Sequence, residues 1–262
     1  MKTSTSKMNA AFKKGLISTA GLLAVLILWQ ILSQNYHTLI LPSPKETYEA
    51  LAELRQSGQL WKNTAITFRR TAAGYAASLI LGLAAALLLR VSSFFRDLLR
   101  PVITVVQIIP PVIWLVLAVI WFGIADDLTP IFLIFIVTFP VIFINLFSGL
   151  QSIDLELVEM ARVYRCSKAQ IVGAVYLPAL VPHLISAVSL GLSFAWKSTI
   201  FAEFLGSSSG IGFALSMANA NLETEKLFAW AVILIAFMFV VEYGVLAPLA
   251  KRVTRWKQHG EG

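Results

Sequence analysis

Long apolar runs restrict this chain to a small set of folds. Six runs of mostly apolar residues follow one another, at about 15–32, 71–89, 101–122, 130–150, 183–202 and 228–250. A helix of about 20 residues crosses the ~30 Å hydrocarbon core of a bilayer and satisfies its own backbone hydrogen bonds there. Of the 262 residues, 58% are hydrophobic and 13% are charged, against roughly 25% charged in soluble domains. We therefore expect an all-α membrane protein with six transmembrane helices.

The first apolar run, 15–32, also invites a second interpretation as a cleavable signal peptide. Four lysines and no acidic residue precede it. The apolar core of a signal peptide is about 7–15 residues long, and a small-residue cleavage site follows it. This run is longer and lacks such a site, so we interpret it as the first span.

Lys and Arg residues are unequally divided between the two sides that six spans define. The side with both termini holds fourteen of them and the opposite side holds six. Because positive residues mark the cytoplasmic side, both termini and residues 154–178 are predicted to be cytoplasmic. The net charge of +7 is then explained by topology and by anionic membrane lipid, rather than by nucleic acid.

Residues 154–178 form a polar, basic interruption that is typical of two short helices. Asp154 is a suitable N-cap for the first helix. Ser167 is the expected start of the second, because Gln170 three positions later completes a capping box. Pro178 is expected to end that helix. A helix pair specified this well predicts a docking element for a soluble partner.

The same stretch resembles the coupling motif of the permease subunits of bacterial ABC importers. That motif reads E-A-A, three residues, G, nine residues, then I-x-L-P. Its first three positions correspond here to Glu159, Met160 and Ala161, with methionine in place of the middle alanine. Its last positions fall at the matching distance on Val175, Leu177 and Pro178.

Arg165 departs from this motif, because the family usually has glycine at that position. Glycine allows a left-handed turn between the two helices. An arginine in that conformation costs on the order of 1 kcal/mol. We therefore expect a turn that is looser or differently capped.

Further pieces are similar to the nitrate/sulfonate/taurine branch of the same family. In order, they are L-P-S-P at 41–44, T-F-R-R-T-A-A-G-Y at 67–75, I-I-P-P at 108–111, A-E-F-L-G at 202–206 and G-I-G at 210–212. Their order and spacing extend the resemblance over roughly residues 40–255.

The resemblance implies a type I ABC importer permease (MetI-like) fold in the bacterial inner membrane. It also implies a second permease copy, two cytoplasmic ABC ATPases that bind the ATP, and an extracytoplasmic solute-binding protein. In the family the motif forms a helix that sits in a cleft of the ATPase. The ATPase-coupling residues carried over are Glu159, Met160, Ala161, Arg162, Arg165, Ser167, Lys168, Leu177 and Pro178. An amphipathic helix at the membrane surface is the competing interpretation.

The chain is expected to divide into three parts. Residues 1–63 hold the N-terminal cytoplasmic tail, the first span and an outer amphipathic segment. Residues 64–255 form a five-helix permease core with the coupling helices at 154–178, and residues 256–262 form a cytoplasmic tail. In the outer segment one side of a helix is expected to carry Tyr48, Leu51 and Leu54.

Two features of the spans predict how the helices pack and bend. Small residues recur every four positions in the second span, at Gly74, Ser78, Gly82 and Ala86, and such a face lets another helix approach closely. Pro110 and Pro111 lie near the middle of the third span and predict a kink, because proline interrupts the hydrogen-bond ladder of a helix.

A polar stripe marks the fifth span. Lys197 lies well inside it, where a charge costs roughly 3 kcal/mol on insertion scales. The stripe follows at helical spacing through Ser186, Ser189, Ser193 and Lys197. One interpretation is that the stripe lines a translocation path at a two-fold axis and favours an anionic solute. The alternative is that Lys197 snorkels, or pairs with an acid such as Glu203 or Glu242.

The sequence predicts no enzyme and no cofactor. The nearest approach to a phosphate-binding loop is Gly191 followed by Trp196, Lys197 and Ser198, which lacks the second glycine and lies in an apolar span. The three histidines are scattered and Cys166 is alone, so neither a metal site nor a catalytic residue is indicated. ATP is therefore expected to be hydrolysed by another chain.

Other functions stay open beside an importer subunit for a small anionic solute. A self-contained secondary transporter or channel would need no capped cytoplasmic helix pair and should carry more acids within the membrane. A membrane-embedded enzyme is disfavoured because no catalytic cluster is found. Within the family, nitrate, sulfonates, taurine and vitamin precursors all fit as solutes.

Overall fold

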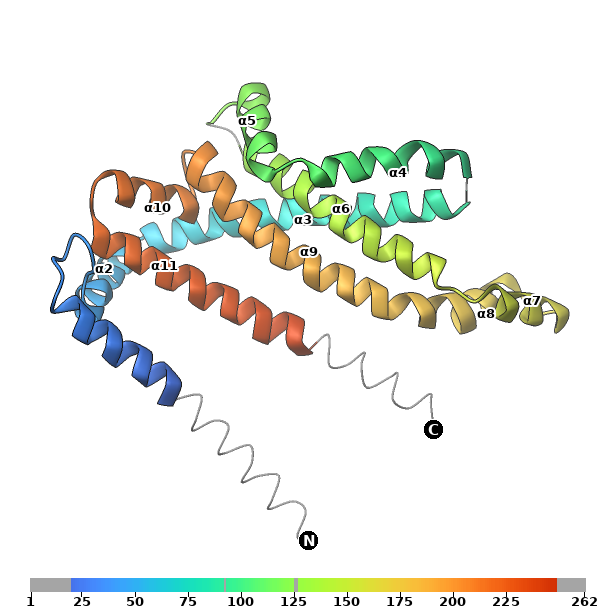
Figure 1. Cartoon of the computed structure of the whole chain (residues 1–262), viewed down its shortest axis with the longest axis horizontal. Helices are drawn as coiled ribbons and strands as arrows, with labels where there is room; N and C mark the ends of the chain where they lie inside the picture. The colour runs from blue at the N-terminus through green and yellow to red at the C-terminus, as the bar shows by residue number, and fades with distance from the viewer. Residues whose placement is uncertain (1–19, 92, 125–126, 249–262) are drawn as a thin grey trace, which may run out of the picture. The chain divides into compact units, whose positions relative to one another are not determined.

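The computed structural model describes residues 20–91, 93–124 and 127–248, and within these ranges it contains helices and short connections but no strand. A helix at Ala20–Ser33 comes first. The α-helices that follow are α2 (Pro44–Gln56), α3 (Gln59–Val91), α4 (Ser93–Ile108), α5 (Pro111–Phe122), α6 (Leu128–Gln151), α7 (Leu155–Val163), α8 (Lys168–Ile171), α9 (Leu177–Gly206), α10 (Ile211–Ala220) and α11 (Thr224–Phe239) (Figure 1). Two π-helical turns, η1 (Val172–Tyr176) and η2 (Val240–Leu246), continue α8 and α11. The predicted all-α fold is confirmed.

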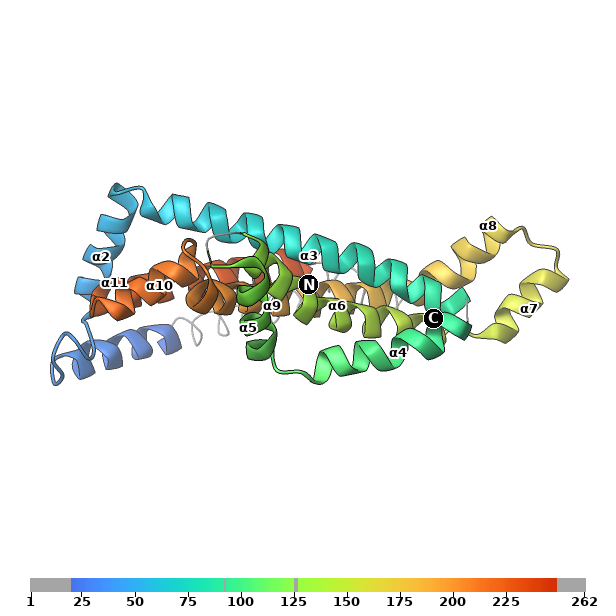
Figure 2. The ribbon, with the colours of Figure 1, turned by 90° about the horizontal axis from the view of Figure 1, so that it is seen from above.

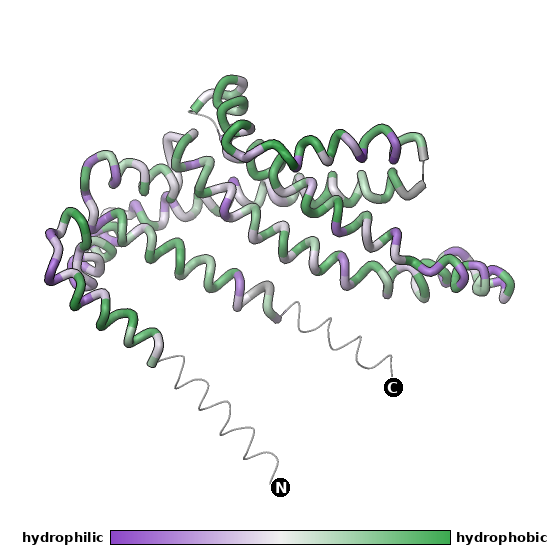
Figure 3. The backbone as a smooth tube through the Cα atoms, viewed as in Figure 1, coloured by the Kyte–Doolittle hydropathy of each residue, from purple (hydrophilic) through white to green (hydrophobic). Residues whose placement is uncertain are grey.

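The six predicted spans each correspond to a helix or a bent helix pair. Four helical stretches of the described residues are long and apolar enough to cross a membrane, at Gln59–Leu89, Leu128–Gln151, Lys168–Gly206 and Thr224–Gly244. A fifth consists of α4 and α5. The helix Ala20–Ser33 lies in the first predicted span, whose residues 15–19 are outside the described part. Figure 3 shows apolar residues along most of α5, α6 and α11.

The third predicted span is broken rather than kinked. α4 and α5 meet at an angle of 98°. Pro110 precedes α5 in an extended conformation with ψ 139°, and Pro111 opens the helix. A residue before proline is pushed out of the helical region, and neither proline has an N–H to donate. The two adjacent prolines therefore end one helix and begin another.

Contacts group the chain into two compact units. Among the described residues, 20–60 and Met217–Ile233 form the first unit, and those of Trp61–Ser216 with 234–248 form the second. In the first unit, the buried face of α2 consists of Thr47, Ala50 and Leu54. Tyr48 is exposed, so its predicted place beside Leu54 is wrong. The buried positions recur at three and four residues, whereas Tyr48 lies on the other side of the helix.

The core of the second unit forms where α3, α6 and α9 pack together. The predicted small-residue face of α3 is the contact: Gly74 faces Ile134, and Gly82 faces Ile142. Gly191 of α9 approaches Ile142 from its own side. Because glycine has no side chain, these helices can come close enough for dense packing. The helix α6 is therefore the centre of this unit.

The helix α3 extends further than the predicted second span. It begins at Gln59, twelve residues before the expected start at Thr71. The added turns carry polar side chains, and their partners lie inside the second unit, as described below. Satisfied polar groups allow the helix to continue where hydropathy alone predicts its end.

Candidate functional site

The first helix of the predicted docking element, α7, begins at its expected cap. The Asp154 side chain accepts a hydrogen bond from the Glu156 amide at 2.8 Å. Val158 is buried and fastens the helix to the hydrophobic core. The other large apolar side chains are exposed, namely Leu155, Leu157, Met160, Val163 and Tyr164. Figures 1 and 2 show α7 and α8 projecting together beyond the end of α6.

The turn after α7 is tightly closed, in contrast to the looser turn expected from Arg165. Arg165 takes the left-handed conformation with φ 55°. Its amide donates to the Arg162 carbonyl at 2.9 Å, and the Cys166 amide donates to the Ala161 carbonyl at 3.0 Å. These two bonds are the Schellman arrangement, which satisfies carbonyls at the end of a helix. The arginine therefore occupies the backbone state that the family usually gives to glycine.

The second helix begins as predicted but does not end as predicted. Ser167 and Gln170 form both bonds of the capping box. Pro178 does not stop the helix, because α8, η1 and α9 continue without a break from Lys168 to Gly206. In η1 the Leu177 amide bonds the carbonyl of Val172, five residues back. This wider turn lies directly before Pro178, which has no N–H to lose at the start of α9.

The candidate coupling residues lie on α7, the turn after it, the start of α8 and the first turn of α9. Ala161 and Pro178 are half-buried, whereas the rest are exposed, namely Glu159, Met160, Arg162, Arg165, Ser167, Lys168 and Leu177. A cavity of about 580 Å³ lies beside α7, and its lining includes Glu159, Arg162 and Tyr176. An exposed surface that mixes apolar and charged side chains is suited to contact with another protein.

The polar stripe lies on the outward face of α9. Ser186 and Lys197 are exposed and Ser189 and Ser193 are half-buried, whereas Ala187, Gly191 and Ala195 are buried on the opposite face. Within the described residues, Lys197 has neither a hydrogen bond nor an ion pair. The alternative that Lys197 pairs with Glu203 is wrong, because Glu203 binds an arginine of α3.

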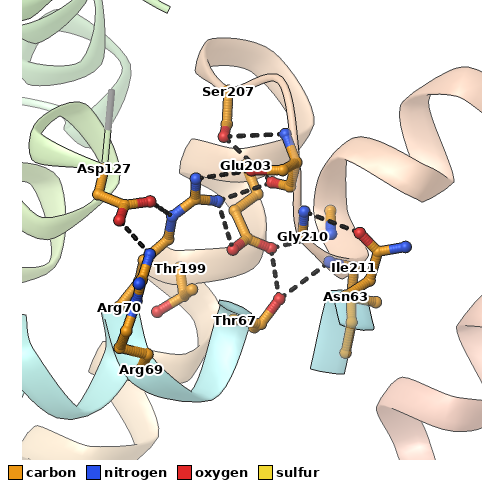
Figure 4. A network of polar contacts seen from close by, with 12 residues as sticks. Asn63, Thr67, Arg69, Arg70, Asp127, Thr199, Glu203, Ser207, Gly210 and Ile211 are labelled. Carbon is orange, nitrogen blue, oxygen red and sulfur yellow. Dashed lines mark hydrogen bonds and ion pairs between the residues drawn. The ribbon is translucent and has the colours of Figure 1, made fainter. Parts of the chain in front are cut away.

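That arginine, Arg70, is the centre of a buried polar network that sequence reasoning missed (Figure 4). The Arg70 side chain is 1% exposed and the Glu203 side chain 0% exposed. Arg70 Nη1 lies 3.0 Å from Glu203 Oε1, and Arg70 Nε lies 2.7 Å from Asp127 Oδ1. Asp127 also pairs with Arg69. The signals for this network were the R-R pair entering the second span and the single acid of A-E-F-L-G in an apolar run.

The network continues to the start of α10. Glu203 Oε2 accepts hydrogen bonds from the Thr67 hydroxyl at 2.8 Å and from the Gly212 amide at 3.1 Å. The Thr67 hydroxyl in turn accepts from the Ile211 amide at 2.9 Å. Asn63 accepts from the Gly210 amide at 3.1 Å. Side chains of α3 and α9 therefore satisfy the first amides of α10, which have no partner within their own helix.

These observations define a class of protein, the multi-pass helical membrane proteins. Residues 78–254 match the family described as binding-protein-dependent transport system inner membrane component, and the chain belongs to this family. It is a permease subunit of an ABC importer, as the resemblance of its coupling motif implied. The match covers more than half of the chain, including α7, α8 and α9.

Curated relatives extend over nearly the whole chain. It is 30% identical over 251 residues to the putative aliphatic sulfonates transport permease protein SsuC of Bacillus subtilis, covering 95% of this chain and 89% of the relative. It is 28% identical to the taurine transport system permease protein TauC of Escherichia coli, covering 92% and 89%. The nitrate import permease protein NrtB of Synechocystis is 31% identical, covering 85% and 81%.

Solved structures share the fold. One chain of the inward-facing MetNI methionine ABC transporter aligns with a TM-score of 0.60 at 19% identity, covering 72% of this chain and 93% of that one. A chain of an amino acid ABC transporter solved with histidines also has a TM-score of 0.60, at 16% identity, covering 80% and 97%. The MetI-like permease fold is thereby confirmed.

Proposed function

We propose that this permease subunit forms, together with a second copy of itself, the translocation path for a small anionic solute. An extracytoplasmic binding protein delivers the solute, and two separate ATPases supply the energy. The names of the relatives support an anion, because sulfonates, taurine and nitrate all present a negatively charged oxyanion group. The exposed α7–α8 pair is the single observation that carries the proposal.

The α7–α8 pair receives the movement of the ATPase. Its exposed apolar side chains and the charges of Glu159, Arg162 and Lys168 give a surface of mixed character on two short, capped helices. The closed turn at Arg165 keeps α7 and α8 in fixed register. Because η1 continues into α9 without a break, a displacement of the pair is passed directly to the helix that carries the polar stripe.

The orientation follows from the distribution of positive charge. The chain termini and the α7–α8 pair lie in the cytoplasm of a bacterium, since the side they share holds most of the Lys and Arg residues. The Arg70 network adjoins the first turn of α6, whereas α7 follows the last turn. With 24 residues, α6 separates the two by about 36 Å at 1.5 Å per residue. The network is then on the extracytoplasmic side.

Reconstitution into phospholipid vesicles tests this function. The chain alone is expected to carry no taurine, ethanesulfonate or nitrate, whereas the same vesicles supplied with its ATPase, its binding protein and ATP accumulate one of them. Uptake by the chain alone would contradict the proposal and support a self-contained transporter. Uptake of a vitamin precursor in place of these anions would reject the anionic solute but keep the importer.

A charge reversal tests the docking surface. Glu159→Lys is expected to abolish the stimulation of ATP hydrolysis by the loaded binding protein, because it repels partners of an exposed carboxylate. Insertion into the membrane should be unchanged. Glu49→Lys, a reversal at an exposed carboxylate of α2, is the matched control and should keep the stimulation. Full stimulation in Glu159→Lys would exclude this surface as the ATPase contact.

A further inference from the structure

The Arg70 guanidinium divides its hydrogen bonds between two carboxylates of very different exposure. Toward α9, Nη1 donates to Glu203 Oε1 at 3.0 Å and to the Ser209 carbonyl at 2.6 Å, and Nη2 donates to the Ser209 hydroxyl at 2.9 Å. Toward the turn between α5 and α6, Nε donates to Asp127 at 2.7 Å. One buried cation therefore joins two structural elements (Figure 4).

The Glu203 side of the network is fully enclosed. All three groups that contact the Glu203 carboxylate are donors, namely Arg70 Nη1, the Thr67 hydroxyl and the Gly212 amide. Gly210, at φ 101°, leaves room for this carboxylate, because a Cβ there would overlap its oxygens. Parting these groups would leave a buried anion and several amides without partners, which proteins strongly avoid.

The Asp127 side is open to solvent. The Asp127 side chain is 37% exposed, and Arg69, its second partner, is 67% exposed. Asp127 precedes α6 as its N-cap residue, but its side chain makes no capping bond there. If this contact opened, Asp127 would remain solvated beside Arg69, while Arg70 would stay neutralised by Glu203. The Arg69–Asp127 pair is of the exposed kind that is weak and is screened by salt, whereas in the Arg70–Asp127 contact only the carboxylate is exposed.

We propose that Arg70 and Glu203 are positioning residues of a two-part latch. The Glu203 half holds α3, the end of α9 and the start of α10 together as one block throughout the transport cycle. The Asp127 half is the releasable contact, where Asp127, the residue before α6, parts from Arg70.

Amide hydrogen exchange of the full-length chain in lipid nanodiscs tests the two halves separately. Glu203→Gln keeps the shape but places an N–H₂ group against donors. It is expected to raise exchange in residues 207–216 by about tenfold or more, because the Gly212 amide and the Thr67 hydroxyl, which itself holds the Ile211 amide, lose their carboxylate acceptor. Asp127→Asn should leave that segment within about twofold and raise exchange only in residues 127–131. Glu242→Gln, the same change at an exposed acid of η2, is the control and should alter neither segment.

The effect of salt on amide exchange distinguishes a releasable contact from a permanent, purely structural one. About 1 M NaCl should reproduce the Asp127→Asn pattern in the unaltered chain, because it screens exposed charges, and should leave residues 207–216 protected.

If Glu203→Gln prevents folding, Thr67→Val keeps every charge, removes the acceptor of the Ile211 amide and should loosen residues 207–216 alone.

Two results would overturn the latch. One is equal loosening of residues 207–216 by Asp127→Asn and by a variant of the enclosed half. The other is unchanged exchange in residues 207–216 in both Glu203→Gln and Thr67→Val. The measurement uses no nucleotide, ATPase or solute, so its outcome is independent of the proposed transport function.

Discussion

Arg165 shows how one residue can keep a backbone state for which its side chain is poorly suited. At φ 55° its Cβ is crowded by the neighbouring carbonyl, which costs an L-residue roughly 1–2 kcal/mol. The two Schellman bonds and the caps on both sides hold the turn closed. The sequence correctly indicated the strain, but not that the surrounding hydrogen bonds would outweigh it.

Relief of this strain is measurable. Arg165→Gly is expected to stabilise the turn by about 0.5–1 kcal/mol, less than the full strain because glycine also gains freedom in the unfolded chain. The amide of Cys166 should then exchange more slowly with solvent. Arg162→Gly, one turn earlier in helical conformation, should have the opposite effect, since glycine weakens a helix by about 1 kcal/mol. Faster exchange in Arg165→Gly would contradict the strain argument.

Glycines show, also at the scale of single residues, where close helix packing requires the absence of a side chain. A Cβ on Gly82 would lie 2.9 Å from Cγ2 of Ile142, too close for a dense core to accept without movement. Gly173, by contrast, has open space where a Cβ would be. Identical substitutions at the two sites therefore separate packing from helix propensity.

Gly82→Ala is expected to lower the stability of the folded chain by about 1–3 kcal/mol, because either α3 or Ile142 must shift. Gly173→Ala should be neutral or slightly stabilising, since alanine favours a helical backbone. Thermal unfolding of both variants in the same detergent gives the comparison. A lower midpoint for Gly173→Ala than for Gly82→Ala would exclude close helix packing as the cause.

At the scale of elements, α2 shows a helix whose start depends on one carboxylate. The Ser43 amide donates to Glu46 Oε2 at 2.7 Å, and the Ser43 hydroxyl closes the capping box. The bond from the Ser43 backbone is the main reason that the pKa of Glu46 is lowered from its usual 4.5. The carboxylate therefore favours the folded helix only while it is ionised.

Because of this lowered pKa, the stability that Glu46 gives to the start of α2 depends on pH with a definite sign. Above pH 4.5 the Glu46 contribution is fully present, and it is lost as the pH falls through the lower pKa of the folded state. Amide exchange at Ser43, corrected for intrinsic rates, should be protected at pH 7 and less so at pH 3. Glu46→Gln should remove most of this pH dependence, whereas Glu49→Gln should retain it. A pH-independent Ser43 amide in the unaltered chain would refute the role of Glu46.

Helix starts were predicted better than helix ends. Asp154 and Ser167 act within a few residues of themselves, so their caps are readable from local sequence. Pro178 does not end its helix as expected, and the prolines at 110–111 bend their span more sharply than the expected kink, because a proline either opens a new helix or breaks a span according to what surrounds it. Hydropathy alone does not distinguish these cases.

At the scale of the whole molecule, the distribution of charge bears on the solute. Arg70 and Glu203 neutralise each other, as do Arg69 and Asp127. Lys197, on the outward face of α9, makes no ion pair with any described residue. In the proposed dimer two such lysines would lie along the path and attract an anion.

Removal of this charge should therefore change solute handling and not assembly. In reconstituted vesicles with ATPase and binding protein, Lys197→Gln is expected to lower uptake of the anionic solute by about tenfold, on the order of 1.4 kcal/mol. Lys197→Arg should keep most of it. Lys226→Gln, a matched loss of charge in the first unit, is the control. Unaltered uptake and selectivity in Lys197→Gln would remove Lys197 from the path.

The sequence by itself determined the class of fold, the approximate positions of the spans and the starts of the two helices that follow α6. Apolar runs of about twenty residues must be helical in a bilayer, and caps and motif spacing are local properties of the chain. Only the tertiary structure decided which polar residues meet. Asp127 and Glu203 lie 57 and 133 positions after Arg70, and no local pattern pairs the three. Their burial is stable only because the packing of α3, α6 and α9 brings opposite charges together with amides that have no partner in their own helix.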